Sequence, residues 1–305
     1  MPGKKPFLSV YGHVTIDQII SLAEFPKLNE SVDVVTKKTS LGGTGTNIAV
    51  SASRLGVPTA ICAFVGDDFP SEYFDEISAS GLYTEELVKV DGTETSQALV
   101  FNNSRLEQKV VFHQGPQGSA SKLGIRLTGY AKESEHVHFC TGDPEYYVSL
   151  MDEIRPFPKS ISVDPAQEVY KLWGNKSLST ALEFADTLFC NEYEAKVIAK
   201  LIGVDDVLEI DKPLVVRTEG SAGSIAKING EGFRIPAIKG EGFEDATGAG
   251  DAYRAGFYAG LYNKYSVNES LVLASTVSSF VVEKVGALTN IPTWDSVLKR
   301  AKPYL

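Results

Sequence analysis

The sequence predicts a three-layer α/β fold in which helices cover both faces of a mostly parallel sheet. Two observations predict it. Short apolar runs alternate along the chain with helical patterns. The runs end in polar or glycine residues, as expected for strands whose carboxyl ends carry a ligand site. With 305 residues, 43% of them hydrophobic, the chain is long enough to bury such a core.

The elements of this fold follow in chain order. Residues 7–13 (FLSVYGH) are predicted as a buried strand, residues 46–56 (TNIAVSASRLG) as a helix closed by Gly56, and residues 59–66 (TAICAFVG) as the next strand. Further helices are predicted at 248–262 and, as an apolar helix with its cap, at 280–287 (FVVEKVGA). The later strands are predicted at 135–142, 160–165, 186–192 and 213–220.

Four segments depart from this alternation. Residues 16–21, 31–38, 96–102 and 107–114 alternate in the manner of strands, without helices between the members of each pair. We interpret them as a small β-sheet that forms a lid. No linker rich in proline, serine or charge divides the sequence, so we expect one domain over residues 1–305 with the lid strands inserted in it.

Composition limits the possible partners and the compartment. The formal charge of −10 argues against a nucleic-acid-binding surface, which needs a basic footprint. Cys62, Cys140 and Cys190 lie in apolar runs without CxxC spacing, which predicts reduced core thiols and a cytoplasmic protein. No apolar run approaches the roughly 18 residues of a membrane span, and no signal peptide is indicated. We therefore expect small or nucleotide partners, with no nucleic acid and no membrane.

The segment EDATGAGDAYRAGF, residues 244–257, carries the main chemical signal. If a helix begins at residue 248, the N–H groups of Gly248, Ala249 and Gly250 are among its unpaired first-turn donors, and the helix dipole adds positive charge there. Small side chains let a phosphate approach this backbone closely. Asp251 then lies beside the bound anion, where it could accept a proton from an attacking hydroxyl. An anion hole next to a base suits phosphoryl transfer.

A structural explanation of the same segment stays open from the residues alone. The segment could be an ordinary helix start whose small residues allow close packing of the helix. These small residues are Ala252, Ala255, Gly256, Ala259 and Gly260.

Two motifs resemble signatures of a known family. DATGAGDAYRAGF (245–257) resembles the C-terminal signature of the ribokinase-like, phosphofructokinase-B type, family of carbohydrate and nucleoside kinases, and LGGTGTNIAVSASRLG (41–56) resembles its N-terminal signature. GHVTIDQI, HFCTGDPEYY, SVDPAQ and ALTNIPTWDSV resemble archaeal nucleoside kinases within that family. One departure is Ala246 after Asp245, where Thr or Pro is usual. The resemblance covers essentially the whole chain and implies a ribokinase-like fold.

The resemblance also implies roles for individual residues. Asp251 corresponds to the catalytic base, and Gly248 to Gly250 correspond to the anion hole. Asp17, Gly43 and Asn47 match positions that bind sugar hydroxyls, and a carboxylate and an amide suit vicinal hydroxyls. The alternative for Asn47 is a helix-entry residue that bonds local backbone.

On the nucleotide side, NEYE (191–194) corresponds to an element near the phosphates and Mg²⁺. It implies that Asn191 reaches a phosphate and that Glu194 holds Mg²⁺ through water, which suits an ion that keeps several waters. TEGSAG (218–223) matches a turn that binds ATP, with Thr218, Glu219, Gly220 and Gly223 as candidate contacts. Its alternative is a tight turn between strands. The family places adenine near the segment 280–287.

A nucleobase needs further contacts, because ribose hydroxyls alone do not distinguish a nucleoside from a free sugar. A nucleobase presents an aromatic face and a donor and acceptor edge, which suit a stacking ring and side-chain amides. The alternative is that the lid residues only stabilise their sheet. The candidates are Gln108, Phe112 and His113 in the lid, Gln167 just past a strand end, and Asp33, which could bind a base edge or a hydroxyl.

The sequence therefore predicts an ATP- and Mg²⁺-dependent kinase for the 5′-hydroxyl of ribonucleosides. Two alternatives stay open: a kinase of ribose, fructose or a sugar phosphate, and a non-catalytic nucleotide-binding sensor. GTGTN (43–47) lacks the third glycine of a dinucleotide fingerprint, so the sequence does not indicate a Rossmann dehydrogenase. His136 and His138 lack the spacing of metal ligands and are expected to be core or strand-surface histidines. Exposed lid strands also suggest a homodimer.

Overall fold

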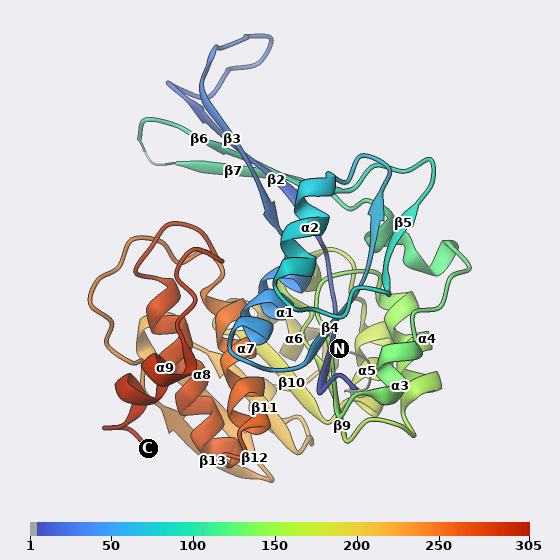
Figure 1. The fold of residues 1–305 in the computed structure, drawn as a ribbon, viewed down its shortest axis with the longest axis vertical. Helices are drawn as coiled ribbons and strands as arrows, with labels where there is room; N and C mark the ends of the chain where they lie inside the picture. The colour runs from blue at the N-terminus through green and yellow to red at the C-terminus, as the bar shows by residue number, and fades with distance from the viewer. Residues whose placement is uncertain (1–4, 106) are drawn as a thin grey trace.

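The computed structural model describes residues 5–105 and 107–305, and within them two sheets organise the chain (Figure 1). The larger sheet has nine strands and the smaller, which we call the lid, has four. In spatial order the larger sheet contains β13 (Glu231–Ile235), β12 (Ser224–Ile228), β11 (Leu214–Thr218), β10 (Thr187–Asn191), β9 (Ser160–Val163), β8 (His136–Phe139), β1 (Leu8–Tyr11), β4 (Thr59–Gly66) and β5 (Leu87–Val90). The lid contains β3 (Val34–Gly42), β2 (Thr15–Leu22), β6 (Ser96–Asn102) and β7 (Gln108–His113).

The large sheet is parallel from β11 to β5, and β12 and β13 add an antiparallel edge. In the lid, β2 pairs with β6 in parallel, and β3 and β7 flank them antiparallel. These findings confirm the predicted mostly parallel α/β sheet and the small second sheet. β4 is buried along its whole length, because both of its faces are covered, and its sequence is correspondingly a continuous apolar run.

Helices cover both faces of the large sheet, and each face has its own buried cluster of apolar side chains. On one face the cluster includes Ile48, Phe257 and Val277, and on the other Tyr147 and Ile198. The first face carries α1 (Thr44–Arg54), α2 (Ser71–Ala79), α7 (Ala249–Tyr262), α8 (Val267–Val281) and α9 (Trp294–Ala301). The second carries α3 (Gly129–Glu133), α4 (Pro144–Ile154), α5 (Asn175–Phe184) and α6 (Glu192–Ile202). Short 3₁₀ turns are η1 (Pro116–Lys122), η2 (Ala166–Tyr170), η3 (Val207–Glu209) and η4 (Gly220–Ala222).

The predicted helix at residues 280–287 is wrong. Helix α8 ends at Val281, so only the first two residues of the predicted segment are helical. The helix begins upstream at a capping box, in which Ser266 and Glu269 satisfy each other's backbone N–H groups. After its end the chain turns, with Gly286 at a φ of 97°. The apolar residues 280–282 are therefore the end of a helix.

The third predicted strand is displaced. It was expected at residues 31–38, whereas β3 spans Val34–Gly42. Its bounds follow from antiparallel pairing with β2, from Thr15 opposite Gly42 to Leu22 opposite Val34. Pairing with a neighbour decides register, and this is not visible in the alternation of a single strand.

The small residues of α7 do serve close packing. A Cβ atom added to Gly256 would lie 2.8 Å from the Cα atom of Ala274, and one added to Gly260 would lie 2.6 Å from the Oγ atom of Ser270, both on α8. The structural explanation of this segment is therefore correct for the middle of the helix, and it leaves the first turn to be explained separately.

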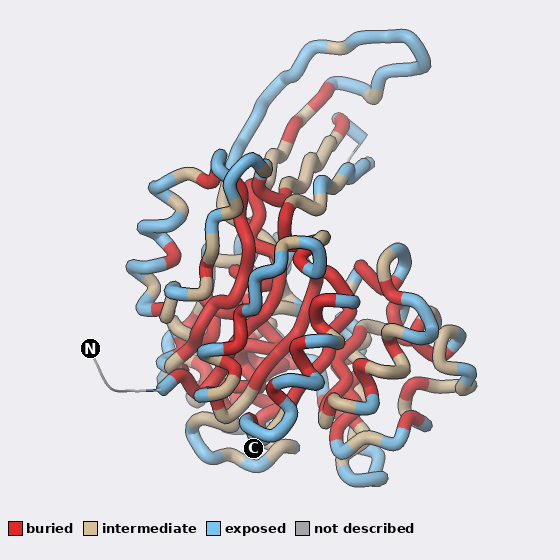
Figure 2. Tube along the Cα trace, turned by 90° about the vertical axis from the view of Figure 1, so that its right-hand side faces the viewer, coloured by how far each residue is buried: buried red, intermediate tan, exposed pale blue. Residues whose placement is uncertain are grey.

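The lid projects beyond the buried body of the protein (Figure 2). Six of the nine residues of β3 are exposed, and five of the six in β7. In the part of the chain that the structure describes, no helix combines the length and apolar character that crossing a membrane requires.

Candidate active site

The carboxyl ends of the parallel strands carry a row of polar side chains. His13 follows β1, Thr141 follows β8, Asp164 follows β9, and Thr218 ends β11. Because these strands are parallel neighbours in one sheet, their ends meet along one edge. The start of α7 reaches the same edge, since Arg254 on its second turn bonds Asp164. This is where ligands bind in open α/β sheets.

Asp251 lies in the first turn of α7 and is bound to the other signature segment. The Nδ2 atom of Asn47 on α1 donates a hydrogen bond of 2.8 Å to Oδ2 of Asp251. Asn47 therefore uses its amide hydrogen across the site, not on local backbone. Burial raises the pKa of Asp251 to about 7, while the bonds from Asn47 and the charge of Arg254 lower it. A partly exposed carboxylate with this pKa can accept a proton near neutral pH.

The first turn of α7 leaves backbone donors open. The N–H group of Ala249 donates to the carbonyl of Ala246 at 3.1 Å, whereas Gly248 and Gly250 donate to no acceptor among the described residues. Gly248 has a φ of 76°, and a Cβ atom there would lie 2.2 Å from Cβ of Ala287, so glycine is required. Two of the three predicted donors are thus free to bind an anion, and the third closes the turn.

A cavity of about 520 Å³ lies between the lid and the strand ends. It contains five of the predicted substrate residues: Asp17, Gly43, Asn47, Phe112 and Gln167. The rest of its lining is His13, Thr15, Thr44, Ala98, Val110, Thr141, Glu168, Tyr170 and Lys171.

A larger cavity, of about 860 Å³, lies beside α4, α5 and η1. It contains none of the predicted site residues. The chemistry of the lining, not the volume, therefore identifies the cavity under the lid as the candidate acceptor site.

The floor of the acceptor cavity depends on two adjacent glycines. A Cβ atom on Gly42 would lie 2.1 Å from Oδ2 of Asp17, so the missing side chain leaves room for this carboxylate. Gly43 has a φ of 97°, and a Cβ atom there would lie 2.3 Å from the carbonyl oxygen of His13. Oδ1 of Asp17 accepts a hydrogen bond of 2.6 Å from Thr15, and burial raises the pKa of Asp17.

Phe112, the aromatic side chain predicted to stack on a nucleobase, lies in the cavity wall. The ring of Phe112 packs edge-on against His13, with 5.1 Å between ring centroids. Phe112 lies opposite Ala98, which lies opposite Asp17, so all three share the face of the lid that looks into the cavity. His113 follows Phe112 and faces the opposite side of the lid.

Asp33 and Gln108 lie outside this cavity. Asp33 is exposed before β3 begins, and Gln108 at the far end of β7 donates to Asn102 within the lid at 3.1 Å. Gln108 shares the cavity-facing side of the strand with Phe112, four residues away. In this arrangement the structure does not bring these two residues to the other candidates, and contact with an acceptor stays a prediction for them.

Sequence reasoning missed a hydrogen-bonded group in the cavity wall. Nδ1 of His13 bonds the hydroxyl of Thr141 at 2.8 Å, and that hydroxyl bonds Thr44 at 2.6 Å. Gln114, just after the lid, donates to the buried carboxylate of Glu168 at 3.0 Å. Burial lowers the pKa of His13 to about 4, so the ring is neutral at neutral pH. The rule that ligands gather at strand ends could have identified His13 and Thr141.

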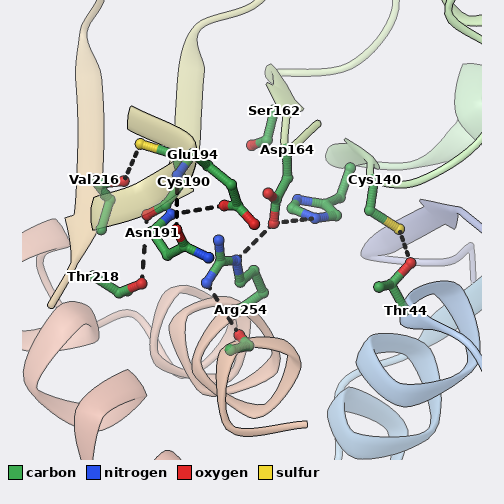
Figure 3. Close-up of polar contacts among 12 residues, drawn as sticks. Thr44, Cys140, Ser162, Asp164, Cys190, Asn191, Glu194, Val216, Thr218 and Arg254 are labelled. Atoms are coloured by element: carbon green, nitrogen blue, oxygen red, sulfur yellow. Dashed lines mark hydrogen bonds and ion pairs between the residues drawn. The ribbon is translucent and has the colours of Figure 1, made fainter. Parts of the chain in front are cut away.

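On the nucleotide side, Asn191 and Glu194 form the cap of α6. Oδ1 of Asn191 accepts bonds of 2.8 Å from the N–H groups of Tyr193 and Glu194. Oε2 of Glu194 accepts one of 2.8 Å from the N–H of Asn191, and Figure 3 shows these two side chains. Nδ2 of Asn191 and Oε1 of Glu194 have no partner among the described residues. Burial, and then the charge of Asp164, raise the pKa of Glu194. The cap leaves one polar atom of each side chain for a ligand.

The turn at residues 218–223 connects β11 to β12. The hydroxyl of Thr218 donates to the carbonyl of Cys190 at 3.4 Å, and Gly220 and Gly223 bracket the 3₁₀ turn η4. The carboxylate of Glu219 is held by Arg217 at 3.0 Å and faces Arg234 at 3.7 Å. Any contact of Glu219 with a nucleotide is therefore expected from its backbone, because its side chain is engaged by arginines.

A buried ion pair beneath the site was not predicted. Nε of Arg254 donates to Oδ2 of Asp164 at 2.7 Å, and each side chain is 5% exposed (Figure 3). The position of Arg254 one turn after Asp251 was readable in the sequence, but its partner was not. As predicted, the two histidines are a core and a strand residue: His138 is buried and His136 is half-buried, and each bonds a hydroxyl. Cys62, Cys140 and Cys190 are free and buried.

Comparisons with known proteins agree with this geometry. The nucleoside kinase of Methanocaldococcus jannaschii is 31% identical over all of this chain and 99% of its own length, and that of Methanothermobacter thermautotrophicus is 34% identical over 96% of this chain and 94% of its own. The crystal structure of the former covers 99% of this chain and all of its own with a TM-score of 0.89. A nucleoside kinase of Burkholderia thailandensis in complex with inosine, 24% identical, shares the fold over 98% of this chain and 97% of its own with a TM-score of 0.87. The model of the pfkB family carbohydrate kinases matches residues 5–294, and the chain belongs to that family.

Proposed function

We propose that this protein is an ATP-dependent kinase that phosphorylates the 5′-hydroxyl of ribonucleosides. One observation carries the proposal: the base candidate Asp251, in the open first turn of α7, is bonded by Asn47, which lines the acceptor cavity, although Asp251 itself is not among the residues that line it. The relatives that are 30–34% identical are nucleoside kinases, whereas the ribokinases that match over a similar share of their length are 25% identical, which favours a nucleoside over a free sugar.

The proposed reaction moves one phosphoryl group. The 5′-oxygen of the nucleoside attacks the γ-phosphorus of ATP and forms a new P–O bond, while the bond from phosphorus to the β,γ-bridging oxygen breaks and ADP leaves. The hydroxyl proton passes to Asp251. The amides of Gly248 and Gly250 donate to the oxygens of the transferred group, where charge must be stabilised.

In the acceptor cavity, Asp17 and Asn47 are proposed to bind the ribose hydroxyls, with Gly43 leaving space for the sugar. Phe112 would pack on the base and Gln167 would bond its edge. The volume of about 520 Å³ lies within the usual range for small-ligand sites. An amide can donate or accept, so we expect broad tolerance among bases.

The donor residues fit an ATP-bound Mg²⁺. No group of three or more His, Cys, Asp or Glu side chains that could hold a metal occurs among residues 5–105 and 107–305, which suits an ion held mainly by phosphates and water. Glu194 offers Oε1 to such a water, and Asn191 offers Nδ2 to a phosphate. Thr218, Gly220, Gly223 and the backbone of Glu219 are proposed to contact ATP. When bound, Mg²⁺ would neutralise charge on the phosphates.

The experiment that tests the substrate is a side-by-side panel of acceptors with ATP. Cytidine, adenosine, inosine and guanosine should show higher kcat/KM than ribose, fructose and fructose 6-phosphate. A clear preference for any free sugar or sugar phosphate would leave the family correct and the substrate class wrong. Nucleotide binding without ADP release for any acceptor would favour the sensor.

The lid also suggests how the protein assembles. We propose one domain with an inserted lid and a cytoplasmic location. We also propose a homodimer through the lid, because β3 and β7 leave unpaired edges and the side chains of Val35 and Val111 are 64% and 57% exposed. Sedimentation at working concentration should give a dimer, and Val35→Lys should shift it toward monomer. A monomeric wild type would remove the dimer from the proposal.

A further inference from the structure

One arginine is buried beneath the start of α7. Arg254 lies three residues after Asp251, and its side chain leans back toward the first turn, as helical side chains do. Its Nη1 atom donates to the carbonyl of Gly250 at 3.3 Å, and its Nε atom donates to Asp164 at 2.7 Å. The guanidinium therefore connects the turn that carries the base to the end of β9.

A buried cation needs compensation, because removing an ion from water is expensive unless it is paired. Burial works to lower the pKa of Arg254, but Asp164, Glu194 and Asp251 hold it above its ordinary value. These carboxylates come from three elements: the end of β9, α6 and α7. The ring of Phe189 lies 5.3 Å from the guanidinium carbon and adds a favourable contact. Arg254 is thus the positive centre of three acidic groups.

Asp164 connects this centre to the acceptor cavity. It is followed by the short turn that places Gln167 and Glu168 in the cavity wall. Its backbone N–H donates to the carbonyl of Phe139 at 2.8 Å, and its Oδ2 atom accepts from Arg254. The ion pair therefore ties the acceptor wall to the helix that carries Asp251.

We propose that Arg254 is a positioning residue: it anchors the loop of Asp164 that forms one wall of the acceptor cavity, and through its bond to the carbonyl of Gly250 it supports Asp251 as the proton acceptor. This inference rests on the proposed function, because it assigns a second residue to the action of the proposed base. It gives the buried ion pair a role in the reaction in addition to any role in the fold.

The groups around Asp251 predict opposite effects of the two partners. The charge of Arg254 lowers the pKa of Asp251, whereas those of Asp164 and Glu194 raise it. Cys140, just after β8, is a further titratable group that interacts with Asp251, and its thiol donates to the carbonyl of Tyr11 at 2.9 Å. The contacts from α1 and α8 are neutral, since Asn47 bonds Asp251 and Ser278 bonds the carbonyl of Ala249. Removing the charge of Arg254 alone should therefore raise the pKa of Asp251, and removing that of Asp164 alone should lower it.

The first experiment measures kcat/KM of the acceptor against pH at saturating ATP and Mg²⁺. Arg254→Met should move the acidic midpoint up by roughly one unit, about tenfold in activity below it, and Asp164→Asn should move it down. The double variant Arg254→Met with Asp164→Asn leaves neither charge unpaired, and its midpoint should return near that of the wild type. Arg254→Lys keeps the charge and should keep the midpoint.

A second measurement does not depend on activity. Carbon-13 NMR of labelled aspartate in the ATP-free protein follows the Asp251 carboxyl directly, with its signal assigned by its loss in Asp251→Asn. An unmoved Asp251 midpoint in folded Arg254→Met would overturn the inference. If Arg254→Met does not fold, an unmoved Asp251 midpoint in Asp164→Asn overturns the inference. Full turnover in Asp251→Asn would instead refute the proposed base, whatever the NMR titrations give.

Discussion

The two walls of the candidate site are built differently. One wall is the start of α7, a helix whose residues 252–260 are all buried. Asn47 holds this wall to α1, and Arg254 holds it to the end of β9. The lid, in contrast, is a four-stranded sheet with exposed outer strands. The proposed base lies on the wall whose geometry is fixed from several sides, and the proposed contacts with the base of the acceptor lie partly on the wall with few supports. Regions with few buried contacts open at low free-energy cost, so the lid is the wall that can adapt to a ligand.

The largest effect on turnover is expected at the wall formed by the start of α7. Asp251→Asn removes the proposed base without changing its shape, so turnover should fall by about 100-fold or more. Steady-state kinetics with saturating ATP and nucleoside measures this, and nucleotide binding by calorimetry should stay near the wild-type value. Wild-type turnover in this variant would show that Asp251 is not the base.

The same variant should be more stable than the wild type at alkaline pH. The folded pKa of about 7 lies above the unfolded value of 3.8, so the stability that this group contributes is complete below pH 3.8 and is lost as the pH rises through 7. The asparagine does not ionise, so its advantage should grow over that interval to at most about 4 kcal/mol. Urea unfolding at pH 5 and pH 8 measures the difference, and equal gains at both pH values would contradict the shift.

The wild-type enzyme should lose activity in acid for the same reason. With a base of pKa about 7, kcat/KM should fall about tenfold for each pH unit below that midpoint and level off above it. Measurement from pH 5 to pH 9 with constant ionic strength tests this. A midpoint near 4 would mean that this half-buried carboxylate is not shielded from water enough to raise its pKa.

Glu194→Gln tests the nucleotide side of the fixed wall. It keeps the shape of the cap of α6 but removes the charge beside the proposed metal water, so the Mg²⁺ concentration for half-maximal rate should rise about tenfold or more. KM for the nucleoside should change less. Glu192→Gln, on a half-buried neighbouring position, is the matched control. Full wild-type turnover in excess chelator would remove the metal assignment.

The smallest effect is expected in the lid. Phe112→Ala removes the ring that packs on His13 and faces the acceptor, so KM for nucleosides should rise by several-fold and at most about tenfold. Val111→Ala, on the opposite face of the same strand, should leave KM unchanged. If the two substitutions have equal effects, the lid contributes by its stability alone, and the contrast between the walls disappears.

Periodicity predicted the strands β1, β4, β8, β9, β10 and β11 because they are mostly buried and flanked by clear turns. The outer strands β5, β12 and β13 are partly exposed and were not predicted. The positions of Gly248, Gly250, Asp251 and Asn47 could be inferred because they belong to contiguous motifs. The bounds of β3 could not, since strand pairing decides them. Nor could the partners of Arg254 or of His13, because these contacts join residues that are far apart in sequence. Whether Asp33 and Gln108 touch an acceptor stays a prediction.

The bond between Asn47 and Asp251 joins residues 204 positions apart. All residues that line the acceptor cavity lie between His13 and Lys171, so the ribosome delivers this pocket well before it delivers the helix with the base. The pocket is still incomplete at that stage, because Asp164, next to the wall residues Gln167 and Glu168, has its ion-pair partner Arg254 on α7. The proposed base and the ion-pair partner of Asp164 thus arrive together, when α7 emerges and docks against α1, and we expect a product shortened before that helix to have no turnover.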